Sequence, residues 1–280
     1  MLNGEYVKIT FSFFCRHLSM TERGKFRYLR LLPFALSLVF FCVTSASGGP
    51  PFLTDDPEPV EFGHSEFYLF STLDKAKDNT TVQSPAFEFN HGIAPDTQAH
   101  IVFPFTAFAP DDGPAAYGPG DMELGLKYRF IQEKDNFPQV GIFPMLEVST
   151  GDVGRGLGNG RTWAKFPVWA QKSWGQWTTY GGGGYAINQA PGQRDYLFAG
   201  WLLQRDIDEH LTLGGEIFTQ GRTADTGRAA TFANFGGFYN FTKNFSFLFS
   251  VGHTIAGESH LISYLGLYWT WGTSSGEKVN

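Results

Sequence analysis

Cysteine is scarce in this chain of 280 residues, which contains only Cys15 and Cys42, both among the first 46 positions. The remaining sequence therefore has no disulfide framework, thiol nucleophile or cysteine-based zinc site. Charged side chains are also few, at 17% of the residues, where soluble domains have roughly a quarter. Outside the first 46 positions, which hold six basic and two acidic residues, 15 basic and 25 acidic residues remain. An acidic chain without a basic stripe predicts no nucleic-acid partner.

Aromatic side chains and glycine are abundant instead, with 17% aromatic residues and 34 glycines. The stretch Asp121–Phe130 (DMELGLKYRF) places an apolar or aromatic residue at every second position. A strand puts these side chains on one face, whereas a helix would scatter them. Strand 121–131 is therefore expected to have one face suited to hydrocarbon and one suited to water.

The beginning of the chain has the pattern of a secretory signal peptide. Lys25, Arg27 and Arg30 precede an apolar run over 31–43, and small residues follow it over 44–48. The run is too short to cross a membrane comfortably. We expect a signal peptide over 1–48, removed near 46–48, with Met20 as a candidate true start.

Residues 49–64 (GPPFLTDDPEPVEFGH) combine four prolines with four acidic residues, which argues against regular structure. We expect a periplasmic N-terminal segment here. Two interpretations stay open: a plug or latch, whose Asp55, Asp56, Glu58 and Glu61 meet Lys127, Arg129 and Lys165 in the lumen, or a disordered leader to the first strand.

Alternation and turn signals predict twelve strands in the rest of the chain. They are expected at 65–74, 81–91, 97–108, 121–131, 139–149, 162–172, 177–187, 195–205, 210–220, 231–241, 244–254 and 260–271. Most have the length that a tilted strand needs to cross a bilayer, which is about 9–11 residues. A tail over 272–280 follows the last strand, so the chain does not finish on the aromatic residue common in such barrels.

The connections alternate in length. Tight turns such as SWGQ and FTKN follow the even-numbered strands, and longer polar loops such as APDDGPAAYGPG and TGDVGRGLGNGR follow most odd-numbered ones. Outer-membrane barrels have short periplasmic turns and long outer loops. The fold class predicted is therefore all-β, a single antiparallel transmembrane β-barrel of about twelve strands over 65–271 in the outer membrane of a Gram-negative bacterium.

A soluble exported β-sandwich is the alternative, but its outer face would carry more charge than this sequence provides. Pro104, Pro144 and Pro167 lie inside expected strands, where each removes a hydrogen-bond donor. Because a closed barrel has no edge strand, we expect β-bulges at these three positions.

Catalytic and metal-binding patterns are weak. His253, Ser259 and His260 cluster near one loop without a matching acid or nucleophile signature. No group of residues has convincing metal-ligand spacing. We therefore expect no catalytic residue, no cofactor and no metal.

Charged residues on the water-suited faces are candidates for lining the lumen and setting solute selectivity. They are Glu88, Glu123, Lys127, Arg129, Glu147, Lys165 and Glu216. They could equally wet the lumen and pair with one another. If the alternation holds, Tyr68, Phe143 and Trp169 face inward beside them.

Several segments of the mature chain resemble one known family, which is named for the MetA pathway of phenol degradation and whose members are usually called transporters. They are GPPFLTDDPEP (49–59), YGPGDMELGLKYRF (117–130), PQVGIFPMLEVSTGD (138–152), QKSWGQWTTYGGGGYAIN (171–188) and AGWLLQRD (199–206). The resemblance implies an outer-membrane β-barrel that takes up aromatic or other hydrophobic compounds. It implies no catalytic residues.

The function expected is passive uptake of small, hydrophobic or aromatic solutes by a porin-like channel among outer-membrane lipids. A structural or adhesive barrel that displays its loops is one alternative, and a barrel hydrolase is another. Substrate, pore radius and oligomeric state do not follow from the sequence.

Overall fold

A computed structural model describes residues 49–272. The predicted signal peptide, and all of the predicted tail except Gly272, lie outside the described residues. The described strands are β1 (His64–Lys75), β2 (Asn79–Ala94), β3 (Thr97–Pro110), β4 (Ala116–Pro119), β5 (Met122–Ile131), β6 (Gln139–Ile142), β7 (Met145–Val148), β8 (Trp163–Trp174), β9 (Trp177–Ile187), β10 (Tyr196–Asp206), β11 (Leu211–Gln220), β12 (Ala230–Thr242), β13 (Phe245–Gly257) and β14 (Leu261–Gly272), with one 3-10 helix, η1 (Val153–Arg155).

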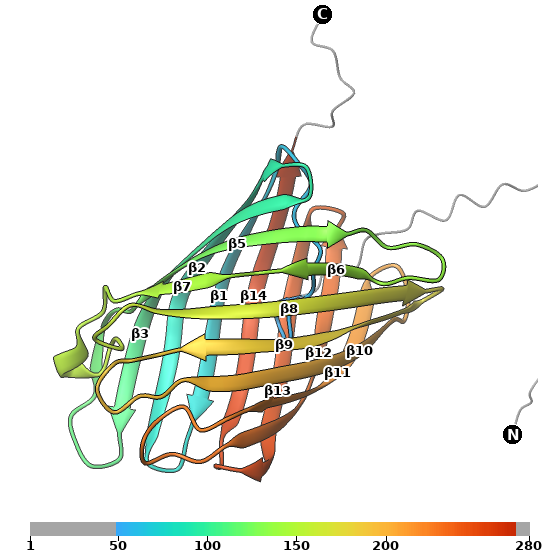
Figure 1. Cartoon of the computed structure of the whole chain (residues 1–280). Coiled ribbons are helices and arrows are strands. Elements are labelled where there is room, and N and C mark those ends of the chain that lie inside the picture. Colours follow the sequence, from blue (N-terminus) through green and yellow to red (C-terminus); the bar gives the residue numbers. More distant parts are fainter. Residues whose placement is uncertain (1–48, 273–280) are drawn as a thin grey trace, which may run out of the picture. The chain divides into compact units, whose positions relative to one another are not determined.

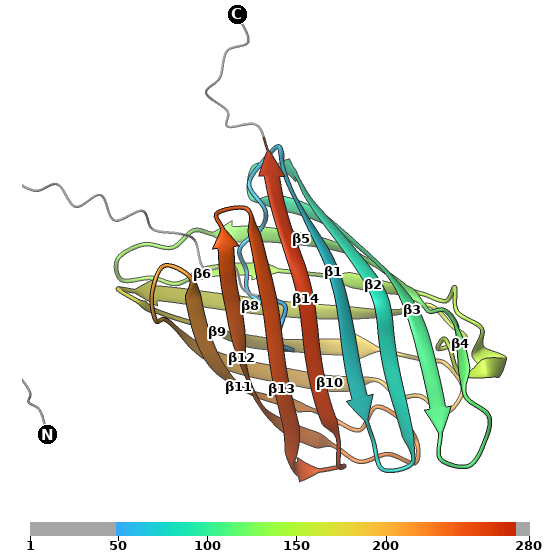
Figure 2. The ribbon, with the colours of Figure 1, turned by 180° about the vertical axis from the view of Figure 1, so that it is seen from behind.

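These segments form one closed antiparallel barrel of twelve strands, as predicted from the sequence (Figures 1 and 2). Segments β4 and β5 are the two parts of one barrel strand, and β6 and β7 are the two parts of the next. Neighbouring strands pair in chain order, and β1 pairs with β14 from His64↔Gly272 to Lys75↔Leu261. This seam closes the barrel, so no strand is left as an open edge.

The three prolines lie where the wall is irregular. Pro144 follows Phe143 in the gap between β6 and β7, and Pro167 lies opposite that gap, where its carbonyl accepts the N–H of Phe143 at 3.3 Å. Pro104 accepts the N–H of Gly120 at 2.9 Å, in the gap between β4 and β5. A register shift lies next to Pro104 on β2, between Gln83 and Ala86. The expected bulge is therefore found near Pro104. Pro144 instead lies in the interruption of its own strand, and Pro167 lies opposite that interruption on the continuous strand β8, so the gap tolerates both missing donors.

Burial alternates along the strands with the polar side inward. In β5, Leu124, Leu126, Tyr128 and Phe130 are 40–47% exposed on the outer face, while Lys127 is 5% exposed inside. Other inward residues are also polar and buried, among them Glu88, Asn90, Gln98, His100, Gln139, Gln171, Gln204, Glu216 and Asn234. This arrangement inverts that of a soluble protein and suits a protein surrounded by hydrocarbon.

Aromatic side chains meet one another near the barrel end that carries the short turns. Phe241 and Phe245 have ring centroids 5.3 Å apart, Phe245 and Trp269 4.9 Å, and Phe89 and Trp271 6.2 Å. Such aromatic girdles mark the membrane–water interface of outer-membrane barrels. In the described part of the chain, no helix is both long and apolar enough to cross a membrane. The closed barrel, its apolar belt and its polar interior place the protein in the outer membrane of a Gram-negative bacterium.

The opposite end carries the long loops, of which 149–162 is folded onto the barrel. Asp121, between β4 and β5, accepts the backbone N–H groups of Thr150 at 3.0 Å, Gly151 at 2.8 Å and Asn159 at 2.6 Å. Leu157 is 3% exposed beneath this loop. The connections 76–78 and 258–260 are shorter than expected, because β1, β2 and β13 extend beyond their predicted ends.

Candidate functional site

Residues 49–63, termed here the N-terminal segment, run through the barrel lumen to its short-turn end, where Glu61 and Phe62 are exposed (Figures 1 and 2). Ser250 of β13 donates a hydrogen bond to the carbonyl of Pro51 at 2.6 Å. The carboxylate of Glu216 on β11 accepts the backbone N–H of Leu53 at 3.1 Å and that of Thr54. Side chains from two nearby strands of the wall, β11 and β13, therefore hold the first part of the segment in place.

The sequence favours this irregular path, because its prolines cannot join a strand ladder and its backbone groups need side-chain partners. Small residues in the wall let it approach closely. A Cβ at Gly200 would collide with Thr54, and one at Gly141 would lie 3.0 Å from Pro57 Cβ. Thr54 and Asp56 are almost completely buried, at 0% and 1% exposed.

Acidic side chains of the segment form ion pairs with β5. Lys127 Nζ lies 3.0 Å from Asp55 Oδ1 and 3.6 Å from Asp56 Oδ1. Arg129 Nη1 lies 3.8 Å from Glu58 Oε1. Val60 is bound through its backbone N–H, which donates to Gln98 Oε1 at 2.9 Å. These contacts extend the attachment of the segment to the short-turn end of the barrel.

A second set of charges belongs to the wall alone and is termed the charge network. In it, His100 Nε2 lies 3.0 Å from Glu123 Oε1 and His100 Nδ1 lies 3.5 Å from Glu88 Oε1. Lys165 Nζ lies 2.8 Å from Glu123 Oε2 and 3.5 Å from Glu147 Oε1. Acidic and basic side chains thus alternate across β2, β3, β5, β8 and β7, so the wall itself supplies the partners of both Lys165 and His100.

Arg129 has a second acidic partner in the turn between β2 and β3. Its Nη2 lies 2.7 Å from Asp96 Oδ1, and its Nε donates to the same oxygen at 3.0 Å. These hydrogen bonds lower the pKa of Asp96, which lies outside the membrane-spanning strands. Asp96 therefore stays ionised and anchors the guanidinium beside the N-terminal segment.

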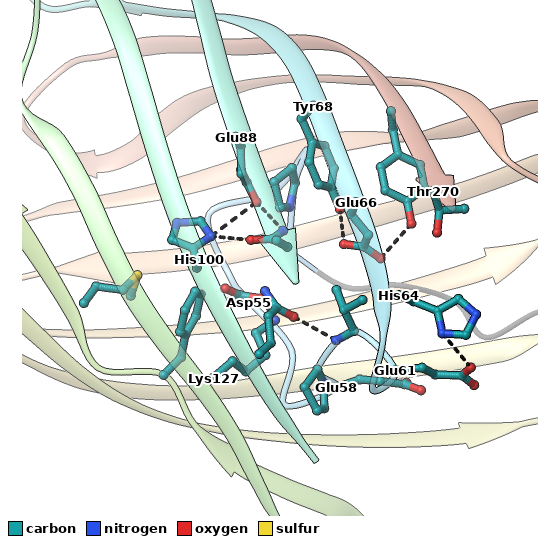
Figure 3. Close-up of a pocket in the computed structure, with 18 of the residues that line it drawn as sticks. Asp55, Glu58, Glu61, His64, Glu66, Tyr68, Glu88, His100, Lys127 and Thr270 are labelled. Atoms are coloured by element: carbon teal, nitrogen blue, oxygen red, sulfur yellow. Dashed lines mark hydrogen bonds and ion pairs between the residues drawn. The ribbon is translucent and has the colours of Figure 1, made fainter. Parts of the chain in front are cut away.

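A cavity of about 360 Å³ remains between the N-terminal segment and the wall (Figure 3). Carboxylates of Asp55, Glu66 and Glu88 border it together with Lys127 and His100. Glu66 accepts hydrogen bonds from the phenols of Tyr68 at 3.1 Å and Tyr268 at 2.7 Å. The lumen therefore keeps space for water and small polar groups beside the segment.

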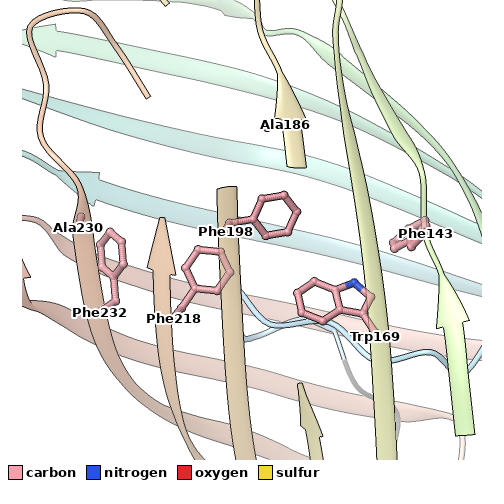
Figure 4. Packing of buried hydrophobic residues seen from close by; sticks show 7 residues of the cluster. All are labelled: Phe143, Trp169, Ala186, Phe198, Phe218, Ala230 and Phe232. Carbon is pink, nitrogen blue, oxygen red and sulfur yellow. The ribbon is translucent and has the colours of Figure 1, made fainter. Parts of the chain in front are cut away.

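One side of the long-loop half of the lumen is apolar. A buried cluster, drawn in Figure 4, contains Phe143, Trp169, Ala186, Phe198, Phe218, Ala230 and Phe232. Trp169 and Phe198 have ring centroids 6.2 Å apart, as do Phe198 and Phe218. Lys165 of the charge network pairs in register with Ala186 of the cluster, so a solute that enters from the loops would meet these aromatic rings and the network's charges at a similar depth.

The seven charged residues selected from the sequence fall into two groups. Glu88, Glu123, Glu147 and Lys165 belong to the charge network, whereas Lys127, Arg129 and Glu216 bind the N-terminal segment. Their role in solute selectivity stays a prediction. Lys165 was considered as a partner of the segment, but its ion pairs within residues 49–272 are with the wall. The segment's other partners were missed, namely Gln98, Gln139, Gln171 and Ser250, although all lie at inward positions of the alternation.

The weak catalytic set does not come together. His253 is exposed on the outer face, and its ring contacts the backbone carbonyl of Thr254. His260 instead pairs with Asp74 at 2.7 Å and packs against Phe232. Within residues 49–272, no group of three or more His, Cys, Asp and Glu residues is arranged to hold a metal ion.

Comparison with solved structures shows the same fold in known outer-membrane proteins. An outer-membrane channel from Pseudomonas putida F1 superposes with a TM-score of 0.68 at 15% sequence identity, over 77% of this chain and 98% of that one. The NanC porin superposes with a TM-score of 0.51 at 8% identity, over 72% of this chain and 98% of that one. No family model matches the chain. No curated protein matches it either.

Proposed function

We propose that the protein is an outer-membrane channel for small solutes, and that its N-terminal segment is a plug in the lumen. The placement of that segment carries the proposal. A barrel of twelve strands is wider than the eight-stranded barrels that side chains alone can fill. Here the extra space is occupied by an irregular segment held by hydrogen bonds and ion pairs rather than by an apolar core. Such contacts can be exchanged for water or solute at a modest net cost.

We further propose that the solutes are small hydrophobic or aromatic compounds, as the resemblance to the phenol-degradation family suggests. The aromatic cluster of the long-loop half supports this, because rings such as Phe198 and Phe218 provide flat apolar faces for stacking. Polar groups beside the cluster, such as Lys165, could orient a substituent. The plug would become the N-terminal part of the mature protein once a signal peptide had been removed near 46–48.

Single-channel recording in planar bilayers tests the proposal. Deleting residues 50–59 should raise the conductance of the folded barrel, because the lumen then holds only wall side chains. Glu216→Ala is a milder variant, which removes the acceptor of two plug N–H groups and should increase the open fraction. Glu209→Ala is its matched control, since the Glu209 side chain is 87% exposed in a turn.

The outcomes separate the candidate functions. Unchanged conductance in a correctly assembled deletion variant would mean that residues 50–59 do not obstruct the path. Absence of conductance in every variant would favour the structural or adhesive barrel. Hydrolysis of ester substrates by the protein in detergent would instead indicate the hydrolase alternative.

A further inference from the structure

The wall contains a group of buried hydrogen-bond donors that hold the Glu58 carboxylate of the plug. Gln139 Nε2 and Gln171 Nε2 donate to Glu58 Oε2 at 3.1 and 3.3 Å, and Arg129 Nη1 lies 3.8 Å from Glu58 Oε1. Gln139 and Gln171 are each 3% exposed. These three residues, from β5, β6 and β8, are termed the donor site. Two amide groups and a guanidinium converging on one carboxylate form a site for a carboxylate in general.

An apolar ring lies directly beside this carboxylate. Pro57 is almost completely buried, and its ring packs against Gly141, where an added Cβ would lie 3.0 Å from Pro57 Cβ. Phe143 borders the same region, with its ring centroid 5.0 Å from Lys127 Nζ. The wall therefore accepts a small apolar ring next to an anionic group, a combination that the plug provides with its Pro-Glu sequence.

The cations opposite the plug differ in how they are compensated. Among residues 49–272, Lys127 forms ion pairs only with Asp55 and Asp56, both of which belong to the plug. Lys165, in contrast, pairs with Glu123 and Glu147 of the wall. Because a buried charge without a partner is costly, withdrawal of the plug leaves a demand for a new anion at Lys127. No such demand arises at Lys165.

The donor site also contains an unused acceptor. The amide oxygen of Gln171 is buried and has no hydrogen-bond partner among the described residues. A hydroxyl group on an entering ring would satisfy it. The chemistry available is thus a carboxylate, a small apolar ring beside the Phe143 side chain, and one hydroxyl donor.

We propose that the donor site and Lys127 bind small aromatic carboxylates, and that the plug occupies this site with Asp55, Asp56, Pro57 and Glu58 until such a solute displaces it. The inference rests on the proposed channel function and names its solute class and its regulation. An aromatic carboxylate arriving from the aromatic cluster replaces the plug's own carboxylates. A neutral aromatic solute lacks the anionic group and leaves the plug in place.

Hydrogen–deuterium exchange on the folded, full-length mature protein tests this competition. The reporters are the backbone amides of Leu53, Thr54 and Val60, which are bound to Glu216 and Gln98. Benzoate should accelerate their exchange in a saturable manner, whereas benzyl alcohol and acetate should not at matched ionic strength. Benzyl alcohol controls for the ring, and acetate controls for the charge.

A matched pair of plug variants tests whether the Glu58 carboxylate occupies the site of the solute carboxylate. Glu58→Gln weakens the competing group, so the benzoate concentration for half-maximal exchange should fall about fivefold, the scale of one charge-assisted hydrogen bond. Glu61→Gln removes a plug carboxylate whose side chain is 85% exposed and whose ionic contact is with His64, so this concentration should not change. An equal shift in both variants would overturn the assignment to the donor site.

Failure of this inference can be told from failure of the channel function. If the variant lacking 50–59 conducts but benzoate leaves the three amides protected, the carboxylate inference is wrong and the channel stands. If benzoate accelerates their exchange but the deletion variant does not conduct, the carboxylate site stands and the channel function is wrong. Equal responses to benzoate and benzyl alcohol would also overturn the inference, because the carboxylate would then not matter.

Discussion

His260 and Asp74 form an ion pair at the long-loop end of the barrel, with 2.7 Å between Nδ1 and Oδ1. His260 lies in the connection between β13 and β14, outside the membrane-spanning strands. The hydrogen bond with Asp74 raises the pKa of His260 above its usual value, and partial burial opposes the shift. The protonated ring therefore ties the last loop to the end of β1, across the barrel seam.

The pair should make stability depend on pH. A histidine whose pKa is raised on folding contributes its full stabilisation below its unfolded pKa, which is about 6.5. That stabilisation is lost as pH rises through the folded pKa. The urea concentration at the unfolding midpoint should therefore fall between pH 5.5 and pH 8.5 more in the wild type than in Asp74→Asn.

His253→Gln is the matched control for this measurement, because His253 lies on the outer face and has no acidic partner within residues 49–272. It should keep the pH dependence of the wild type. An identical pH dependence in the wild type and Asp74→Asn would show that the pair contributes nothing.

At the scale of elements, strand β5 shows how strictly the two faces are separated. Leu126 lies at its middle and is 45% exposed on the outer face. Leu126→Arg should lower the free energy of unfolding in lipid by about 2–4 kcal/mol if the position is near the bilayer midplane. Leu126→Phe, which keeps an apolar surface, should have a free energy of unfolding close to that of the wild type. A Leu126→Arg barrel as stable as the wild type would show that this face does not contact lipid.

Gly125, the inward neighbour of Leu126, has less space for a side chain than its position in the sequence indicates. An arginine here would face the lumen rather than lipid, so the membrane should tolerate it better than an arginine at Leu126. A Cβ at Gly125 would lie 2.6 Å from Phe143 Cε2 and 3.1 Å from His100 Cδ2. Crowding of the lumen is therefore the dominant effect, because even alanine must displace two buried rings.

Loop 149–162 depends on a single carboxylate, Asp121, which accepts three of its backbone N–H groups. Asp121→Ala should release the loop, because among residues 49–272 only the Asp121 carboxylate accepts these three groups together. Trypsin added to intact cells should then cleave after the exposed Arg155 faster than in the wild type. Asp112→Ala, in the exposed connection 111–115, is the control and should leave cleavage unchanged. Equal cleavage of both variants would refute the anchoring role.

The strands were predictable because alternation and turn chemistry are local properties. Strand β9 begins and ends where expected, at Trp177 and Ile187, and most other ends shift by only a few residues. The interruptions at Phe143–Pro144 and Gly120–Asp121 were not predicted. Proline indicates a lost donor, but whether a bulge or a gap absorbs that loss depends on the neighbouring strand.

The candidate site was predictable only in its residue types. The acidic segment and the inward cations were identified, but Lys165 was grouped with Lys127 and Arg129. Which cation meets which carboxylate depends on strand register and tilt, since Asp55 and Lys127 are 72 positions apart in the chain. Buried amides such as Gln139 and Gln171 carry no charge. Only their inward positions in the strand alternation could have indicated that they line the lumen.

At the scale of the whole molecule, the closed hydrogen-bond ladder predicts slow denaturation in detergent. Every strand has two neighbours, and β1 pairs with β14 over its whole length. The folded protein should therefore migrate faster on a gel when unheated than after boiling, and it should fractionate with outer membranes. Recovery of the protein in the soluble periplasmic fraction would contradict the membrane barrel.

The plug is continuous with β1, because its last residues, 60–63, lead directly to His64. Strand β1 therefore acts as the tether of the plug. A tethered group returns to its site at an effective concentration set by the tether, in the millimolar range for short flexible links. Re-entry of the plug would then be a first-order event that no added protein can accelerate. Current records should show brief closures whose rate is independent of the number of barrels in the bilayer, and each open interval would last as long as a solute delays that return.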